Sequence, residues 1–259
     1  MQDKKRNIIR FILKIICLMM IIIPGWILYN YYSQIENNKE LVGELKDEIT
    51  KTPTATATDS DSTEAIIDLA PIYKQNNDLV GWLTIPNTEI DYPVMQTPDD
   101  EEYYLRKNFN KEYDINGTLF CKAEADILKP SDNITIYGHH MKANVMFKPL
   151  DNYRDEDFYK SHKEIIFYTI DKDNLQTTKN TYEVIAAYTT DVKVGTYPYD
   201  EFIDGTEEEF NEFIKNVTSN TPYNIDTSNI KYGDKFISLS TCAYHTSEGR
   251  FVIIAKKIK

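Results

Sequence analysis

The chain is poor in the residues on which disulfide-rich, metal-dependent and nucleotide-binding proteins depend. Its 259 residues include only three cysteines, too few for a disulfide framework. The sequence contains no HExxH, no CxxC pair, no Walker loop and no GxGxxG, so neither metal nor nucleotide chemistry has support. We therefore expect no cofactor and no bound metal.

The chain has no excess of basic charge outside its N-terminus. The first 14 residues carry a net charge of +4, because five Lys or Arg residues outnumber Asp3. The whole chain has a net charge of −12, which leaves −16 on the other 245 residues. Nucleic-acid binding rewards clustered Lys and Arg, so an acidic body of this kind argues against a nucleic-acid partner.

Long apolar runs are also rare, and the single one lies at residues 11–29. At about 1.5 Å per residue in a helix, this run approaches the ~30 Å of a bilayer core. Aromatic residues of the kind found at membrane interfaces follow it, namely Trp26, Tyr29, Tyr31 and Tyr32. Residues 1–32 are therefore predicted to form a cytoplasmic N-terminus and a single membrane anchor, with the body outside the cell. A cleaved signal peptide is the alternative, but no small-x-small cleavage site follows the run.

Two further regions follow the predicted anchor. Residues 33–63 predict a stalk and a linker: Ile35, Val42, Leu45 and Ile49 have roughly helical spacing, which predicts a short solvated helix. The Thr-rich stretch 51–63 has almost no apolar content, which predicts a flexible tether. Residues 64–259 are long enough for one substantial domain, because 41% of the chain is hydrophobic.

Short β segments dominate this domain. Alternating apolar residues and turn signals predict eight strands, at 80–85, 90–95, 118–120, 134–137, 164–169, 181–189, 235–240 and 251–256. Eight short strands in under 200 residues predict a mainly β fold, a closed or nearly closed barrel. Helices are expected at 64–76, 100–106, 146–152, 155–160 and 207–218, the last with an apolar face and an acidic first turn.

Residues suited to acyl transfer lie at the ends of three predicted strands. Cys242 ends the segment Phe236-Ile-Ser-Leu-Ser-Thr-Cys242, and Arg250 opens the next strand, which can return antiparallel to the first. His139 and His140 follow the strand at 134–137, after Gly138. Successive residues of a strand point to opposite faces, so only one histidine can face the thiol, and the pattern alone does not choose between them. A thiol, an imidazole and a guanidinium are the groups that chemistry through a thioester requires.

The other cysteines and histidines have ordinary interpretations beside functional ones. Cys121 is expected to be a small buried hydrophobic residue, with a redox partnership with Cys242 as the alternative. Cys17 lies in the predicted membrane segment. His245, three residues past Cys242, is a further candidate on the connecting loop, and His162 is expected on the solvated surface.

Taken together, the motifs and their order resemble the sortase family, and more narrowly its class B. The resemblance covers residues 66–258 and rests on Ser240-Thr-Cys242 with Arg250 following, and on Tyr137-Gly-His139. Supporting stretches are Gly81-Trp82, the segments at 90–96 and 117–120, and the predicted helix that begins near Thr206. The resemblance implies an eight-stranded sortase-type barrel with N-terminal helices and an extra helix before the cysteine strand.

It also implies a function and a role for each site residue. Cys242 would be the nucleophile, His139 the general acid and base, and Arg250 the group that stabilises the substrate carbonyl and oxyanion. The backbone around Ser240 and Thr241 would line the substrate pocket. The implied reaction cleaves a C-terminal sorting signal of secreted proteins after Thr, with an Asn-Pro-x-Thr type of signal typical of the class. The acyl group would then pass to an amine of the cell-wall precursor.

Two other functions are compatible with parts of the pattern. A plain cysteine endopeptidase of the papain type also uses Cys and His, but its cysteine comes early, at the start of a helix, and its histidine follows. Here the order is His139 and then Cys242, both at strand ends. The second alternative is a membrane-anchored extracellular binding domain in which Cys242 is only structural.

Overall fold

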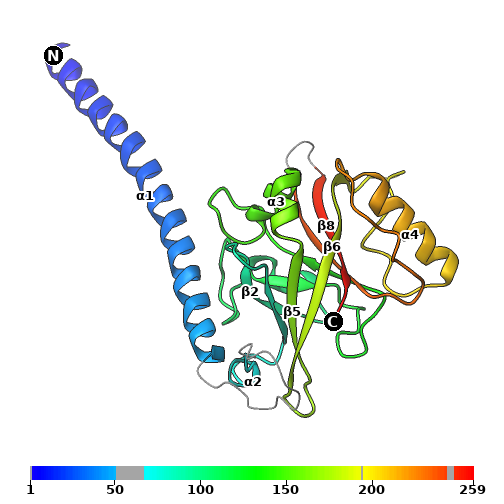
Figure 1. Ribbon diagram of the computed structural model, residues 1–259. Helices are drawn as coiled ribbons and strands as arrows, with labels where there is room; N and C mark the ends of the chain where they lie inside the picture. Colours follow the sequence, from blue (N-terminus) through cyan, green and yellow to red (C-terminus); the bar gives the residue numbers. More distant parts are fainter. Residues whose placement is uncertain (1, 51–66, 194, 244–247) are drawn as a thin grey trace. The chain divides into compact units, whose positions relative to one another are not determined.

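The protein is described by a computed structural model that covers residues 2–50, 67–193, 195–243 and 248–259 (Figure 1). The chain divides into two compact units, Met1–Leu41 and Val42–Lys259. The predicted flexible tether at 51–63 and His245 lie outside the described residues.

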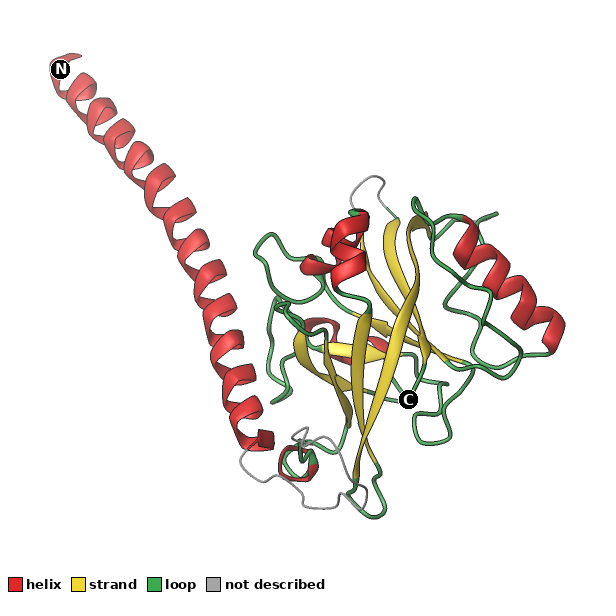
Figure 2. Ribbon diagram, viewed as in Figure 1, coloured by secondary structure: helices red, strands yellow, loops and turns green. Residues whose placement is uncertain are grey.

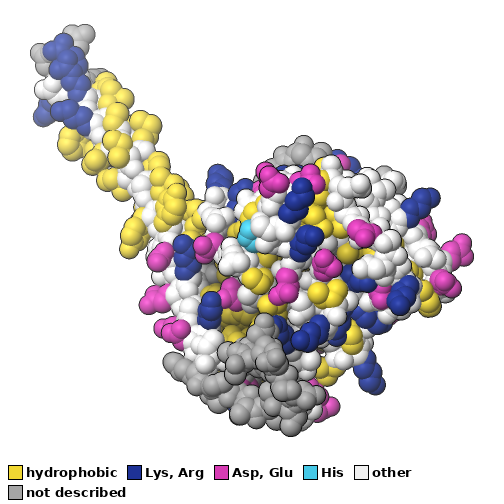
Figure 3. All heavy atoms as spheres, in the orientation of Figure 1, with side chains coloured by type: hydrophobic (Ala, Val, Ile, Leu, Met, Phe, Trp, Pro, Cys, Tyr) yellow, Lys and Arg dark blue, Asp and Glu magenta, His cyan; other side chains and the backbone are white. Residues whose placement is uncertain are grey.

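A single long helix, α1 (Gln2–Thr50), contains both the predicted membrane segment and the stalk helix, which the sequence predicted to be separate. From Ile9 this helix is long and apolar enough to cross a membrane, with a mean hydropathy of 2.5 over its most apolar window. Figure 3 shows apolar side chains along it and Lys and Arg side chains near its start. The stalk was expected to be solvated, yet Leu45 and Ile49 are buried, because residues from Val42 onward belong to the second unit.

The second unit is built on a closed eight-stranded barrel, as predicted (Figures 1 and 2). The order of strands around the barrel is β1-β2-β3-β4-β7-β8-β6-β5. The strands are β1 (Leu79–Thr84), β2 (Asp91–Met95), β3 (Leu119–Cys121), β4 (Asn133–Tyr137), β5 (Glu164–Ile170), β6 (Thr177–Asp191), β7 (Phe236–Cys242) and β8 (Gly249–Lys257). The pairs β2–β3 and β4–β7 are parallel, and all the others are antiparallel.

All eight predicted strands are present, within a few residues of their expected bounds. The largest difference is β6, which has 15 residues and extends past both ends of the predicted segment at 181–189. It is long because its first half pairs with β5 and its second half with β8, so it forms one wall of the barrel. Its ends are rich in polar residues and lack alternating apolar positions, so the sequence pattern predicted a shorter strand.

Short helices close the loops between strands. They are η1 (Glu101–Arg106), η2 (Lys148–Arg154), α3 (Glu156–Ser161) and α4 (Glu207–Ser219), close to the expected positions. Thr206 and Glu209 form a capping box that fixes the start of α4. The helix expected at 64–76 is wrong in length: among the described residues of that range only Ala70–Tyr73 are helical (α2), with Pro71 in the first turn, where a missing amide proton is tolerated.

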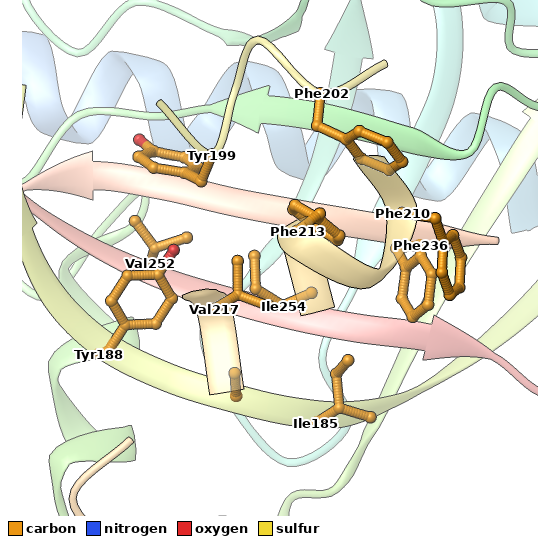
Figure 4. Close-up of a cluster of buried hydrophobic side chains, with 11 residues drawn as sticks. Ile185, Tyr188, Tyr199, Phe202, Phe210, Phe213, Val217, Phe236, Val252 and Ile254 are labelled. Carbon is orange, nitrogen blue, oxygen red and sulfur yellow. The ribbon is translucent and has the colours of Figure 1, made fainter. Parts of the chain in front are cut away.

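Helix α4 is attached to the barrel by an aromatic cluster (Figure 4). Phe210, Phe213 and Val217 form its buried face, and each is at most 1% exposed. They pack with Phe236 of β7 and with residues of β6 and β8. The apolar face predicted from the sequence therefore covers the outer side of β7 and β8, the strands that carry Cys242 and Arg250.

Candidate active site

Three strand ends bring the predicted site residues together. Strands β4 and β7 are parallel neighbours in which Tyr137 pairs with Ser240. His139 and Cys242 each lie two residues beyond this pair. Strand β8 returns antiparallel to β7, and its Arg250 pairs directly with Cys242. The antiparallel return that the sequence predicted is confirmed, and the parallel pairing adds the histidine from more than a hundred residues away.

These residues line one cavity of about 230 Å³. Cys242, His139 and Arg250 are all half-buried in its wall, so each can be reached from the cavity. The other lining residues are Glu101, Glu102, Leu105, Phe120, Lys122, Tyr137, Gly138, Val192, Tyr199, Asp200, Ser240 and Thr241. The wall thus combines a thiol, an imidazole, charged groups of both signs and apolar side chains, which suits a peptide ligand.

The imidazole of His139 is fixed by one hydrogen bond to the backbone. Its Nε2 lies 2.7 Å from the carbonyl oxygen of Leu105. A carbonyl oxygen can only accept, so Nε2 carries a proton and Nδ1 is the nitrogen left to exchange one. Burial lowers the pKa of His139, and the hydrogen bond to Leu105 opposes this shift in part. The ring is therefore held mainly in its neutral form near pH 7.

Gly138 allows the ends of β4 and β7 to meet closely. Thr241 Oγ1 donates to the carbonyl oxygen of Gly138 over 2.8 Å, and the Gly138 amide donates to Ser240 over 3.1 Å. A Cβ at position 138 would lie 2.5 Å from Leu119 Cδ2 and 2.6 Å from a ring carbon of Phe147. The glycine of the Tyr-Gly-His motif is therefore required by packing beneath the histidine.

Ser240 and Thr241, predicted to contribute backbone to the pocket, both line the cavity. Their side chains have partners of their own: Thr241 bonds Gly138, and Ser240 Oγ lies 2.6 Å from the hydroxyl of Tyr199. The Tyr199 ring belongs to the aromatic cluster under α4, as Figure 4 shows. Burial raises the pKa of Tyr199, so its hydroxyl stays protonated at neutral pH. The packing of α4 is thus connected to the cavity wall.

Several lining residues were not predicted as site residues. Tyr137 belongs to the Tyr137-Gly-His139 motif, but the sequence pattern indicated no role of its own for it. Its hydroxyl donates to Asp200 over 2.9 Å. Tyr199 and Asp200 lie in the loop after β6, which carries no recognisable motif. Glu101 and Glu102 begin helix η1 and both line the cavity, and Glu101 accepts a hydrogen bond from the Ala123 amide. Only the barrel's closure brings these loops together.

The remaining candidates lie elsewhere. His140 does not line the cavity; its Nε2 lies 2.6 Å from Asp151 Oδ2. His162 was expected to be solvated but is half-buried, with its ring stacked 3.9 Å from that of Phe158. Cys121 is buried, its thiol lies 3.6 Å from the Met95 carbonyl oxygen, and burial raises its pKa to about 12. The prediction that Cys121 is a small buried hydrophobic residue is confirmed.

Comparisons with known proteins agree with this geometry. The family model described as "Sortase domain" matches residues 83–258. A curated relative, Sortase B of Listeria monocytogenes, is 31% identical over 250 residues, which cover 95% of each chain. The chain therefore belongs to the sortase family.

Solved structures place it within that family. The crystal structure of sortase B from Bacillus anthracis in complex with AAEK2 has a TM-score of 0.72 and 29% identity, covering 86% of this chain and 97% of the other. A Staphylococcus aureus sortase B–substrate complex has a TM-score of 0.65 and 27% identity, covering 89% and 95%. With these relatives the protein is a class B sortase, an enzyme of the cysteine transpeptidase type.

Proposed function

We propose that Cys242, His139 and Arg250 are the catalytic residues of this transpeptidase. The observation that carries the proposal is their meeting on one cavity, from the ends of three adjacent strands. Cys121, the other cysteine of the barrel, is buried and does not line that cavity. Only a thiol that a peptide can reach is able to act as the nucleophile.

The first half-reaction forms a thioester. The Cys242 thiol gives its proton to Nδ1 of His139 as its sulfur attacks the carbonyl carbon of the scissile peptide bond, and the resulting oxyanion is stabilised by the Arg250 guanidinium. When the intermediate collapses, the carbon–nitrogen bond breaks and His139 gives a proton to the leaving amine. Nδ1 is the nitrogen that handles this proton, because Nε2 donates to the Leu105 carbonyl oxygen.

The second half-reaction returns the enzyme to its starting state. Neutral His139 takes a proton from an incoming amine, which attacks the thioester carbon. The carbon–sulfur bond then breaks, and His139 passes the proton to the leaving sulfur, which restores the Cys242 thiol. A buried imidazole with a lowered pKa suits this step, since it is neutral and ready to accept a proton near pH 7. The same ring thus serves both halves of the reaction.

The substrate is proposed to be the C-terminal sorting signal of a secreted protein, cleaved after Thr, in a sequence of the Asn-Pro-x-Thr type. The acceptor is proposed to be an amine of the cell-wall precursor. A relative with the same barrel has been solved as a sortase B–substrate complex. The cavity here has both apolar walls, such as Phe120 and Val192, and polar ones, as a peptide with mixed side chains needs.

The apolar part of α1 is proposed to anchor the enzyme in the cell membrane, with the N-terminus in the cytoplasm and the barrel outside. Lys and Arg precede the apolar run, which favours this orientation. Protease treatment of intact cells should release the barrel and leave the N-terminus protected. Release of the barrel without protease would instead indicate a cleaved signal peptide.

The enzymatic proposal is tested with the soluble barrel domain and a fluorogenic pentapeptide library, with and without an added amine. Cleavage that requires Cys242, together with a mass-identified product joined to the amine, is the expected result. Cleavage to free acid only, whatever the amine concentration, would indicate a plain endopeptidase. Peptide binding without turnover would indicate a binding domain.

A further inference from the structure

The loop that begins at His139 is closed by hydrogen bonds of Met146 and Phe147 at its other end. The His139 carbonyl oxygen accepts from the Phe147 amide over 3.0 Å, and the Met146 amide donates to the Tyr92 hydroxyl over 3.1 Å. Met146 has a φ of 54°, a left-handed conformation that is uncommon for a side chain of this kind. Such a conformation persists only where the surroundings impose it. The surrounding contacts therefore hold this loop in one conformation against the backbone strain at Met146.

His140, the next residue, supplies a further contact from a side chain. Its Nε2 lies 2.6 Å from Asp151 Oδ2, and because a carboxylate only accepts, the histidine donates. The His140 side chain is only 11% exposed, so this charge-assisted bond is shielded from water. The bond joins the residue beside His139 to helix η2.

Asp151 in turn is held by two cations of η2. Lys148 Nζ lies 2.7 Å from Oδ2, and Arg154 Nε lies 3.3 Å from Oδ1. Burial of the Asp151 carboxyl opposes ionisation, but the hydrogen bonds from Lys148 and His140 outweigh it and lower its pKa. The carboxylate is therefore ionised at neutral pH.

Arg154 extends the contacts to the strands on the other side of the site. Its Nη1 donates to Thr189 Oγ1 over 2.6 Å, and its guanidinium lies 4.1 Å from the centre of the Phe251 ring. Thr189 pairs with Phe251, and Phe251 directly follows Arg250 in β8. A chain of contacts thus runs from the residue beside His139 to the residue beside Arg250, and Asp151 lies at its centre.

We propose that His140 and Asp151 are positioning residues, whose hydrogen bond fixes His139 relative to Cys242 and Arg250. The inference rests on the proposed function and deepens it. Neither residue lines the cavity that holds the Cys242 thiol. Their loss misplaces the acid/base group without weakening substrate binding, which lowers kcat and leaves KM unchanged.

The test measures kcat and KM for peptide cleavage in four variants of the full chain. His140→Ala and Asp151→Ala should each lower kcat about tenfold, less than the ~10²-fold cost of a misplacement of about 1 Å, with KM within about twofold of wild type. His140→Gln places an amide nitrogen where Nε2 stood, so it should restore kcat to within about twofold. The double variant should be no slower than the worse single variant, because both remove the same contact.

Two controls separate positioning from stability. His162→Ala removes a ring that stacks on Phe158 away from the cavity and should leave kcat unchanged. Asp155 caps α3 through hydrogen bonds to Asp157 and Phe158, so Asp155→Ala should lower Tm without lowering kcat.

Three results would overturn the proposal: an unchanged kcat in His140→Ala, a His140→Gln variant as slow as His140→Ala, or a double variant about 100-fold slower, the product of two independent losses. A wild-type enzyme that does not turn over, or a Cys242→Ala variant that does, would contradict the proposed function instead.

Discussion

Replacing Gly138 by alanine tests how the packing beneath the histidine controls the site. The new Cβ would lie 2.5 Å from Leu119 Cδ2 and 2.6 Å from Phe147 Cδ2, well inside the 3.4–4 Å of ordinary contact. Both neighbours are fully buried, so neither can turn aside into solvent. Gly138 does not have a positive φ, and the cost of the methyl group is therefore steric.

The expected loss has two parts. Overpacking of a well-filled core costs about 1–3 kcal/mol. At ~2–4 °C per kcal/mol for a domain of this size, Tm should fall by about 2–12 °C. The Phe147 amide also donates a hydrogen bond to the His139 carbonyl oxygen. A shift of Phe147 is therefore expected to shift His139 as well. A shift of about 1 Å at the reacting groups costs up to ~10²-fold, and we expect kcat to fall by about 10- to 100-fold.

The assays are thermal unfolding and peptide cleavage, with Gly43→Ala as the matched control. Gly43 lies in α1, within the second unit, and a Cβ there would meet nothing within 4 Å. That substitution should raise helix stability by about 1 kcal/mol and leave kcat unchanged. A Gly138→Ala enzyme with wild-type Tm and wild-type kcat would refute the packing argument.

Three other predictions concern the site and the core. Arg250→Lys keeps the charge but loses the planar fork, so kcat/KM should fall at least ~100-fold, the scale for one oxyanion donor; near-wild-type activity would reduce Arg250 to an electrostatic bystander. NMR titration, with His139→Gln to assign the resonance, should give His139 a pKa below 6.5, because burial disfavours the imidazolium; a pKa above 6.5 would contradict the proposed neutral base. Phe213→Ala should destabilise the barrel by ~3–5 kcal/mol in urea unfolding without changing kcat at low temperature, since Phe213 is buried in the α4 cluster and does not line the cavity; a loss under ~1 kcal/mol would mean that α4 is not fixed by this cluster.

Much of the barrel was predictable because alternation along a strand follows burial of one face. The antiparallel return from Cys242 to Arg250 was predictable from the short separation of the two residues. The choice between His139 and His140 was not, because the pattern gives both a strand-end position. The structure separates them by their partners: the Leu105 carbonyl oxygen at the cavity for one and the Asp151 carboxylate for the other.

Contacts between distant segments account for what the sequence did not reveal. The parallel pairing of β4 with β7 joins residues about a hundred positions apart, and no local signal specifies it. Tyr199 and Glu101 reach the cavity from loops without a motif. The end of α1 looked solvated by its spacing alone, but Lys46 pairs with Asp91 over 2.5 Å and Ile49 is buried, contacts that local periodicity cannot show.

The central claim is that Cys242 forms the acyl-enzyme, and intact-protein mass spectrometry tests it most directly. The enzyme is mixed with a sorting-signal peptide, quenched in acid and digested to locate the adduct. The account predicts a hydroxylamine-sensitive acyl group on Cys242, absent from Cys242→Ala and lost when an amine acceptor is added. An acyl group on Cys121, or cleavage that proceeds in Cys242→Ala, would contradict it.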